Sequence, residues 1–195
     1  MTYWDPVPTR RAAEGGPLPD PDGGSWVPSD QYGIWNLRPD RWAELDWRNV
    51  PGPFYGSGTD NCWMGRLIAP DNVLYEDDRG AEFVYRQPRN PAETRAVMGA
   101  AAQDPYVGYA CDGDDHWTPE LVRDWWRERA RVREWAVALD RKWSVSRRGD
   151  EREAAGGARA YVAHLDGDLA DYLRGYLFWL QERRPARRGE PLPSL

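Results

Sequence analysis

The spacing of apolar residues after Thr118 constrains this chain more than any other feature of its 195 residues. Apolar side chains recur there at gaps of three, four and seven, which places them on one face of an α-helix. Thr118-Pro119 supplies the start, because Thr caps a first turn and Pro fits the first helical position. The predicted stripe is Leu121, Val122, Trp125, Val132, Ala136, Leu139 and Trp143. A polar linker at 147–157 and a last helix over about 158–183 are predicted to follow.

The chain before Thr118 is interrupted by Pro and Gly, so only short elements fit there. Short β-branched or aromatic runs predict strands at 31–37, 62–68, 73–76 and 82–86. The turn at 77–81 contains a Gly and suits a hairpin between the last two strands. Pro39 can open a short helix through Trp47, and Asn90-Pro91 starts a helix to about Gln103. The predicted fold class is α+β, with a small antiparallel sheet in the N-terminal and central part and a helical C-terminal half.

The two ends of the chain differ in composition from the rest. Residues 1–30 hold six prolines, which predicts an extended Pro/Gly-rich arm. Indole rings are costly to leave in water, so we expect Trp4 and Trp26 to anchor this arm on the domain. Residues 31–184 are predicted to form a single α+β domain, and 185–195 a flexible tail.

The overall charge and composition limit the classes of binding partner that suit this chain. The net charge is −6, which disfavours binding to nucleic-acid phosphates and suits a partner with a basic surface. The chain holds 12 Trp and 10 Tyr but only 3 Phe, so amphipathic rings are expected near the surface. No apolar run approaches the roughly 20 residues of a membrane span, and no signal peptide is readable at the N-terminus. Two distant cysteines indicate no disulfide framework. The expected compartment is the cytoplasm.

An acidic loop precedes the long helix and is the most suggestive candidate site. It holds Asp112, Asp114, Asp115 and His116. Asp112, Asp114 and His116 are candidate ligands for a metal ion, but one loop rarely completes such a site, and the calcium-loop pattern lacks its terminal Glu. A solvated acidic turn is the alternative, and as a negative patch it can meet an Arg- or Lys-rich partner.

A second candidate surface lies on the long helix. Trp126 sits at the margin of the apolar stripe, beside Arg123 and Arg127. Trp and Arg lead the residue types that dominate interface energies, so these side chains are predicted to bind a partner. The alternative is a Trp packed under the N-terminal arm.

Catalytic patterns are absent from the sequence. Cys62 or Cys111 with His116 can form a nucleophile pair only if the fold joins them. The glycines of residues 52–61 do not have phosphate-loop spacing and precede a predicted strand. No catalytic residue and no cofactor is therefore predicted.

Several segments resemble those of an actinobacterial protein family without an assigned activity. They are GPFYGSGTDNCW (52–63), APDNVLY, EFVYRQPR, YACDGDDHWTPELVRDWW (109–126) and DQYGIWNLRPDRW. The resemblance covers most of the chain and implies a bacterial cytoplasmic setting. It carries over no catalytic residue.

The leading hypothesis is a protein-binding module that acts by surface complementarity. Its most concrete form is an antitoxin or immunity protein that inhibits a toxic enzyme, by analogy with other small acidic bacterial proteins. The alternative is a small metal- or nucleotide-dependent enzyme that uses the loop from Asp112 to His116.

Overall fold

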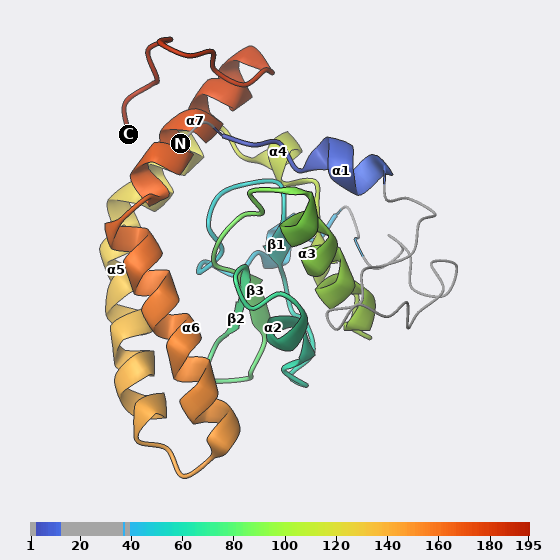
Figure 1. The fold of residues 1–195 in the computed structure, drawn as a ribbon, viewed down its shortest axis with the longest axis vertical. Coiled ribbons are helices and arrows are strands. Elements are labelled where there is room, and N and C mark those ends of the chain that lie inside the picture. Colours follow the sequence, from blue (N-terminus) through green and yellow to red (C-terminus); the bar gives the residue numbers. More distant parts are fainter. Residues whose placement is uncertain (1–2, 13–36, 38–39) are drawn as a thin grey trace. The chain divides into compact units, whose positions relative to one another are not determined.

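The computed structural model describes residues 3–12, 37 and 40–195, and these form two compact units (Figure 1). The mixed unit comprises residues 4–116, and the helical unit comprises Tyr3 with residues 117–195. The predicted α+β class, with antiparallel strands and a helical C-terminal half, is confirmed. The expected single domain over 31–184 stays a prediction, because the placement of the two units relative to one another is not determined.

The mixed unit combines short helices with two small antiparallel sheets. Its elements are α1 (Val7–Ala12), η2 (Trp42–Glu44), β1 (Tyr55–Gly56), α2 (Met64–Ile68), β2 (Val73–Tyr75), β3 (Glu82–Val84), α3 (Pro91–Gln103), β4 (Tyr109–Ala110) and α4 (Gly113–His116). Strand β1 pairs with β4, and β2 pairs with β3. Within the predicted strand at 31–37, only Leu37 is described, and it forms a bridge to Tyr109.

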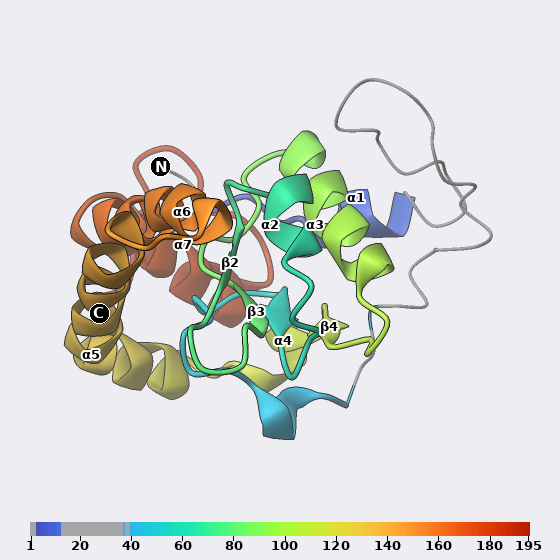
Figure 2. The same ribbon diagram turned by 90° about the horizontal axis from the view of Figure 1, so that it is seen from below.

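The core of the mixed unit lies between the sheets and α3. Phe54, Val73, Val84, Val97 and Tyr109 are fully buried there. Helix α2 packs against α3, as Figure 2 shows. The β2–β3 hairpin is the one predicted from residues 73–86, with Val73 opposite Val84.

Residues 62–68 are not a strand, contrary to the sequence prediction. Trp63 has a left-handed backbone (φ 62°), and the chain then turns into α2. The Gly65 N–H donates to the buried Glu82 carboxylate at 2.7 Å. A Cβ on Gly65 would lie 2.1 Å from that carboxylate, so only glycine permits this approach. Met64 and Leu67, apolar in the predicted strand, are exposed.

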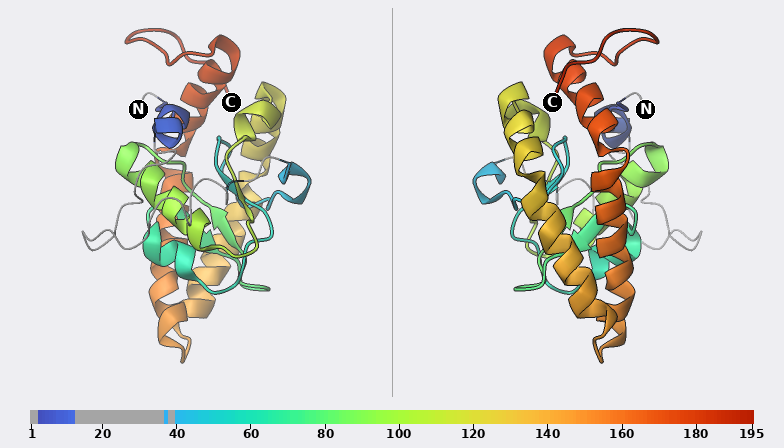
Figure 3. Two further views of the ribbon diagram at one scale, coloured as in Figure 1. Left: turned by 90° about the vertical axis from the view of Figure 1, so that its right-hand side faces the viewer. Right: turned by 90° about the vertical axis from the view of Figure 1, so that its left-hand side faces the viewer.

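The helical unit consists of α5 (Pro119–Ser144), α6 (Gly149–Asp166) and α7 (Leu169–Glu182). Helices α5 and α6 run antiparallel and side by side (Figure 3). The predicted linker at 147–157 is wrong, since α6 begins at Gly149. The segment is polar and flanked by glycines, as a linker would be, but its small buried residues (Ala154, Ala155, Gly157 and Ala158) allow close packing. The predicted helix over 158–183 is interrupted at Gly167, where a Cβ would lie 2.7 Å from the Ala163 carbonyl.

Tyr3, the first residue that the structure describes, packs among the rings of the helical unit. Tyr3 is 3% exposed, and its ring lies 5.3–5.8 Å from the rings of Tyr172, Tyr176 and Trp179. Trp4 is only half-buried, and Trp26 lies outside the described residues. Residues 7–12 form α1, so this part of the arm is helical rather than extended. In the tail, Arg184 holds Glu190 through two hydrogen bonds.

The predicted starts of three other helices agree with the structure to different extents. The helix expected from Pro39 through Trp47 is limited to the three residues of η2. By contrast, the Asn90 side chain accepts the Glu93 N–H at 3.0 Å, and the Thr118 side chain accepts the Leu121 N–H at 3.3 Å. Both predicted caps are confirmed.

Asn90→Ala is expected to lower the free energy of unfolding by about 1 kcal/mol, because the first turn of α3 loses its capping acceptor. Chemical denaturation measures the loss, and Asn90→Ser, which keeps an acceptor, should restore most of it. An unchanged stability of the Ala variant would contradict the capping role.

Candidate functional site

The acidic loop folds into the one-turn helix α4. Asp112, which directly precedes α4, makes the hydrogen bonds that connect it to its surroundings. The Tyr55 hydroxyl donates to Asp112 Oδ1 at 2.8 Å, and His116 Nε2 lies 3.0 Å from Asp112 Oδ2. Trp42 stacks on the His116 ring with centroids 4.9 Å apart. Burial, and then the Asp112 carboxylate, raises the pKa of Tyr55, so its phenol remains a donor. Asp112 thus joins β1, η2 and α4 of the mixed unit.

The predicted loop residues do not converge on one point. Asp114 is buried, Asp115 is exposed, and the side chain of His116 is one-third exposed. Among the described residues, only Glu76, Asp77 and Asp78 bring three potential metal-binding atoms within 4.8 Å of one another. The proposed ligand set of Asp112, Asp114 and His116 therefore lacks a common centre.

The predicted residues on α5 belong to the helical unit and contact their own neighbours. The Arg129 guanidinium lies 3.8 Å from the centroid of the Trp126 ring. Arg127 pairs with Asp124. Arg123 donates to the Ser194 carbonyl oxygen at 3.1 Å. The loop residues lie in the mixed unit, so the two predicted patches belong to different units.

The two thiols are poor nucleophiles. Cys62 is exposed, and its hydrogen bond to Asp60 raises the pKa of its thiol. Burial raises the pKa of the Cys111 thiol. Since the thiolate is the reactive form, both cysteines are kept in their less reactive state.

The mixed unit also contains a polar cleft of about 770 Å³ that the sequence prediction did not include. Its lining residues come from three loops and a hairpin turn. They are Glu44, Asp46, Trp47, Arg48, Gly58, Thr59, Glu76, Asp78, Arg79, Ala81 and Tyr106. We call this surface the hairpin cleft.

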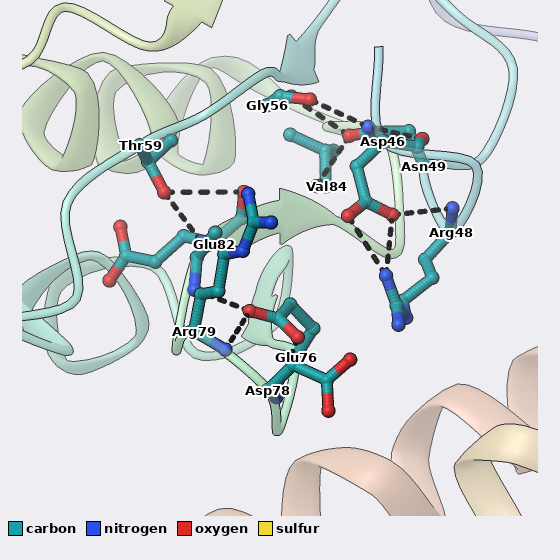
Figure 4. Close-up of polar contacts among 11 residues, drawn as sticks. Asp46, Arg48, Asn49, Gly56, Thr59, Glu76, Asp78, Arg79, Glu82 and Val84 are labelled. Carbon is teal, nitrogen blue, oxygen red and sulfur yellow. Dashed lines mark hydrogen bonds and ion pairs between the residues drawn. The ribbon is translucent and has the colours of Figure 1, made fainter. Parts of the chain in front are cut away.

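One wall of the hairpin cleft is fixed by Asn49, which is 1% exposed. Its amide donates to the carbonyls of Asp46 and Gly56, both at 2.8 Å. Its side-chain oxygen accepts the backbone N–H of Gly56 at 2.8 Å and of Val84 at 2.9 Å. Beside it, Arg48 Nη1 lies 3.0 Å from Asp46 Oδ2 (Figure 4). One buried amide therefore ties the 46–50 loop to β1 and β3.

The opposite wall is the tight turn between β2 and β3. The Glu76 carboxylate accepts the backbone N–H groups of Asp78 at 2.7 Å, Arg79 at 2.6 Å and Ala81 at 3.1 Å (Figure 4). Gly80 adopts φ +76°, and a Cβ there would lie 2.7 Å from the Trp63 indole nitrogen. These contacts hold the turn in one conformation, and the carboxylate of Glu76 is already satisfied by them.

A cluster of buried carboxylates, Asp60, Glu82 and Asp104, lies next to Thr59 of the lining. The Thr59 hydroxyl accepts the Glu82 N–H at 2.5 Å, and the Tyr109 hydroxyl donates to Glu82 Oε2 at 2.6 Å. Burial raises the pKa of Glu82 to about 7, and the charges of Asp60 and Asp104 contribute. Asp104 in turn accepts the N–H groups of Tyr106 and Gly108, at 3.0 and 2.6 Å. The loop that carries Tyr106 is thereby fixed.

The rim of the hairpin cleft presents rings and guanidinium groups. Tyr106 is 67% exposed. The Arg48 guanidinium lies 4.5 Å from the centroid of the half-buried Trp47 ring. Arg79 and Asp78 are exposed on the turn. The arrangement offers hydrogen-bonding and stacking groups on a backbone that internal hydrogen bonds hold in place.

Comparisons with models of protein families, with curated protein sequences and with solved structures gave no match. The resemblance to an actinobacterial family therefore stays a prediction. Within the described part of the chain, no helix is both long and apolar enough to cross a membrane.

Proposed function

We propose that this protein is a binding module that recognises another protein through the hairpin cleft. The observation that carries the proposal is the combination of fixed walls with a rim of Trp47, Arg48, Arg79 and Tyr106. Trp, Tyr and Arg dominate the energies of protein interfaces. Walls already held by internal hydrogen bonds lose little conformational entropy on binding.

The charge of the chain supports a partner with a basic surface. The net charge is −6, and carboxylates outnumber guanidinium groups four to two in the lining of the cleft. Opposite charge on the partner speeds association and disfavours wrong partners. Asp115 and the Trp126 region of α5 are proposed as further contacts. An antitoxin or immunity protein that inhibits a toxic enzyme in the bacterial cytoplasm is the most concrete form of this proposal.

Affinity purification of the full chain from extracts of its own organism tests the proposal. We expect a stoichiometric protein partner with the native chain. Tyr106→Arg should lower the affinity by about tenfold or more, because it replaces an exposed ring on the rim with a charge that repels a basic surface.

Val145→Arg is the matched control, since Val145 is 83% exposed and lies in the helical unit. It should retain the partner fully. Recovery of no stoichiometric partner, or equal retention by the Tyr106 and Val145 variants, would refute binding through the hairpin cleft.

The second candidate is an enzyme centred on Asp112 and His116. It is favoured by the 3.0 Å contact between His116 Nε2 and Asp112, which can orient the imidazole as a general base. A thermal-shift screen with divalent metals and nucleotides tests it, because a bound ligand raises the melting temperature. An enzyme of this kind requires a stabilising ligand whose effect is lost in His116→Ala.

A further inference from the structure

We infer that Arg79 is the anchor of the hairpin cleft and binds a carboxylate side chain that the partner presents next to a basic residue. The inference rests on the proposed function and names the chemistry of the segment that enters the cleft. It depends on the pairing of the two arginines in the lining, on the fixed geometry of the turn and on the charges around Arg79.

The two arginines that line the cleft differ in their pairing. Arg48 is held by Asp46 through both oxygens of the carboxylate, at 3.0 and 3.3 Å. The side chain of Arg79 makes no hydrogen bond or ion pair with the residues that the structure describes. A guanidinium group offers five N–H donors in a planar fork that matches a carboxylate. Arg79 is therefore the cation in this cleft that is available to a ligand.

The backbone of Arg79 is already positioned. Its N–H donates to Glu76 at 2.6 Å, and the next residue, Gly80, is held against Trp63. The Trp63 ring stacks on Tyr75 of β2 with centroids 4.4 Å apart. An arginine on a fixed turn loses only side-chain freedom when it binds a ligand. Its entropy cost of binding is therefore lower than that of an arginine on a flexible loop.

The surrounding carboxylates determine what kind of anion can bind. Asp78 is exposed beside Arg79, and Glu76 and Asp46 lie in the same lining (Figure 4). A phosphate or other multiply charged anion would be repelled by them. A single carboxylate with an adjacent positive charge satisfies both Arg79 and Asp78. The favoured occupant is thus a mixed-charge peptide segment, whose aliphatic stems can pack against the exposed ring of Tyr106.

Two capped dipeptides serve as probes in a nuclear magnetic resonance titration of the full chain. Acetyl-Arg-Glu-amide carries the proposed charge pair, and acetyl-Arg-Gln-amide lacks the carboxylate. We expect the first peptide to shift the side-chain Nε–H resonance of Arg79 and the indole N–H resonance of Trp47 in a saturable manner. The second peptide should bind about tenfold more weakly, since a hydrogen bond to a charged group is lost.

Arg79→Gln should lower the association constant of acetyl-Arg-Glu-amide by about tenfold. Arg95→Gln, on α3 and outside the lining, should leave it unchanged. Equal binding of the two peptides, unchanged binding by Arg79→Gln, or no shift up to the solubility limit of the peptide would each overturn the inference.

The two proposals fail in different ways. If the purified partner binds the Arg79→Gln variant as tightly as the native chain but is lost from Tyr106→Arg, the protein-binding function stands and the carboxylate anchor is wrong. If the peptide binds through Arg79 and no protein partner is recovered, the anchor stands and the function as a protein-binding module is wrong.

Discussion

Asn49→Ala is expected to lower the free energy of unfolding by about 4 kcal/mol, since each buried group left without a partner costs about 1–3 kcal/mol. The substitution would leave the buried N–H groups of Gly56 and Val84 without an acceptor, and the carbonyl of Gly56 would keep only the Asp46 N–H at 3.3 Å. These groups lie on β1 and β3, so the loss would also release the 46–50 wall of the hairpin cleft.

Urea denaturation of the native chain and the Asn49→Ala variant measures this effect. Asn61→Ala is the control, because Asn61 is exposed and surface changes usually stay within about 0.5 kcal/mol. A loss below about 1 kcal/mol for Asn49→Ala would mean that water or another side chain replaces the amide. In that case the Asn49 side chain is not what holds the 46–50 wall of the hairpin cleft.

The stability of the native chain is expected to fall as pH rises from about 4.5 to about 7, through the buried Glu82. The pKa of Glu82 is raised in the folded state, so the folded chain binds a proton that the unfolded chain has already released. This contribution is complete below the ordinary pKa of 4.5, is lost as pH rises through the folded pKa of about 7, and is flat above it. Its full size is about 3 kcal/mol, at about 1.4 kcal/mol per pKa unit.

Glu82→Gln removes the titrating group and leaves a side chain of the same shape between Gly65 and Tyr109. We expect the stability of the variant to fall much less over this pH range. Above pH 7 the variant should be more stable than the native chain. Glu128→Gln, an exposed change on α5, should keep the native profile. A Glu82→Gln profile parallel to the native one would show that another group is responsible, such as Asp104, whose pKa is also raised by burial.

The elements predicted correctly are those whose boundaries depend on local chemistry. Asn90-Pro91 and Thr118-Pro119 combine a side-chain cap with a favoured proline, and both begin helices. The hairpin at 73–84 follows from two short runs joined by a turn that contains Gly80. These signals act within a few residues, so they can be read from the sequence alone.

The elements that were missed depend on contacts distant in sequence. Helix α2 forms where Gly65 meets Glu82, 17 residues later. The start of α6 resembles a linker because it is polar and its glycines lower the local helix preference, although Ala154, Ala155 and Gly157 are buried in the helical unit. Intrinsic preference cannot reveal a helix that is stabilised by its packing.

The candidate site was predicted only in part. The acidic loop was noticed, but the role of Asp112 as a hydrogen-bond acceptor depends on Tyr55, 57 residues away. The hairpin cleft was missed because its lining residues are spread from Glu44 to Tyr106. Asn49 resembles any loop asparagine in sequence, and only the folded chain brings Gly56 and Val84 to its amide.

Hydrogen–deuterium exchange of the full chain with and without its purified partner tests the central claim most directly. If the hairpin cleft is the binding surface, the partner should slow exchange in residues 44–48, 76–81 and around Tyr106. Slowed exchange confined to other segments, such as the Trp126 region of α5, with these three unchanged, would contradict it.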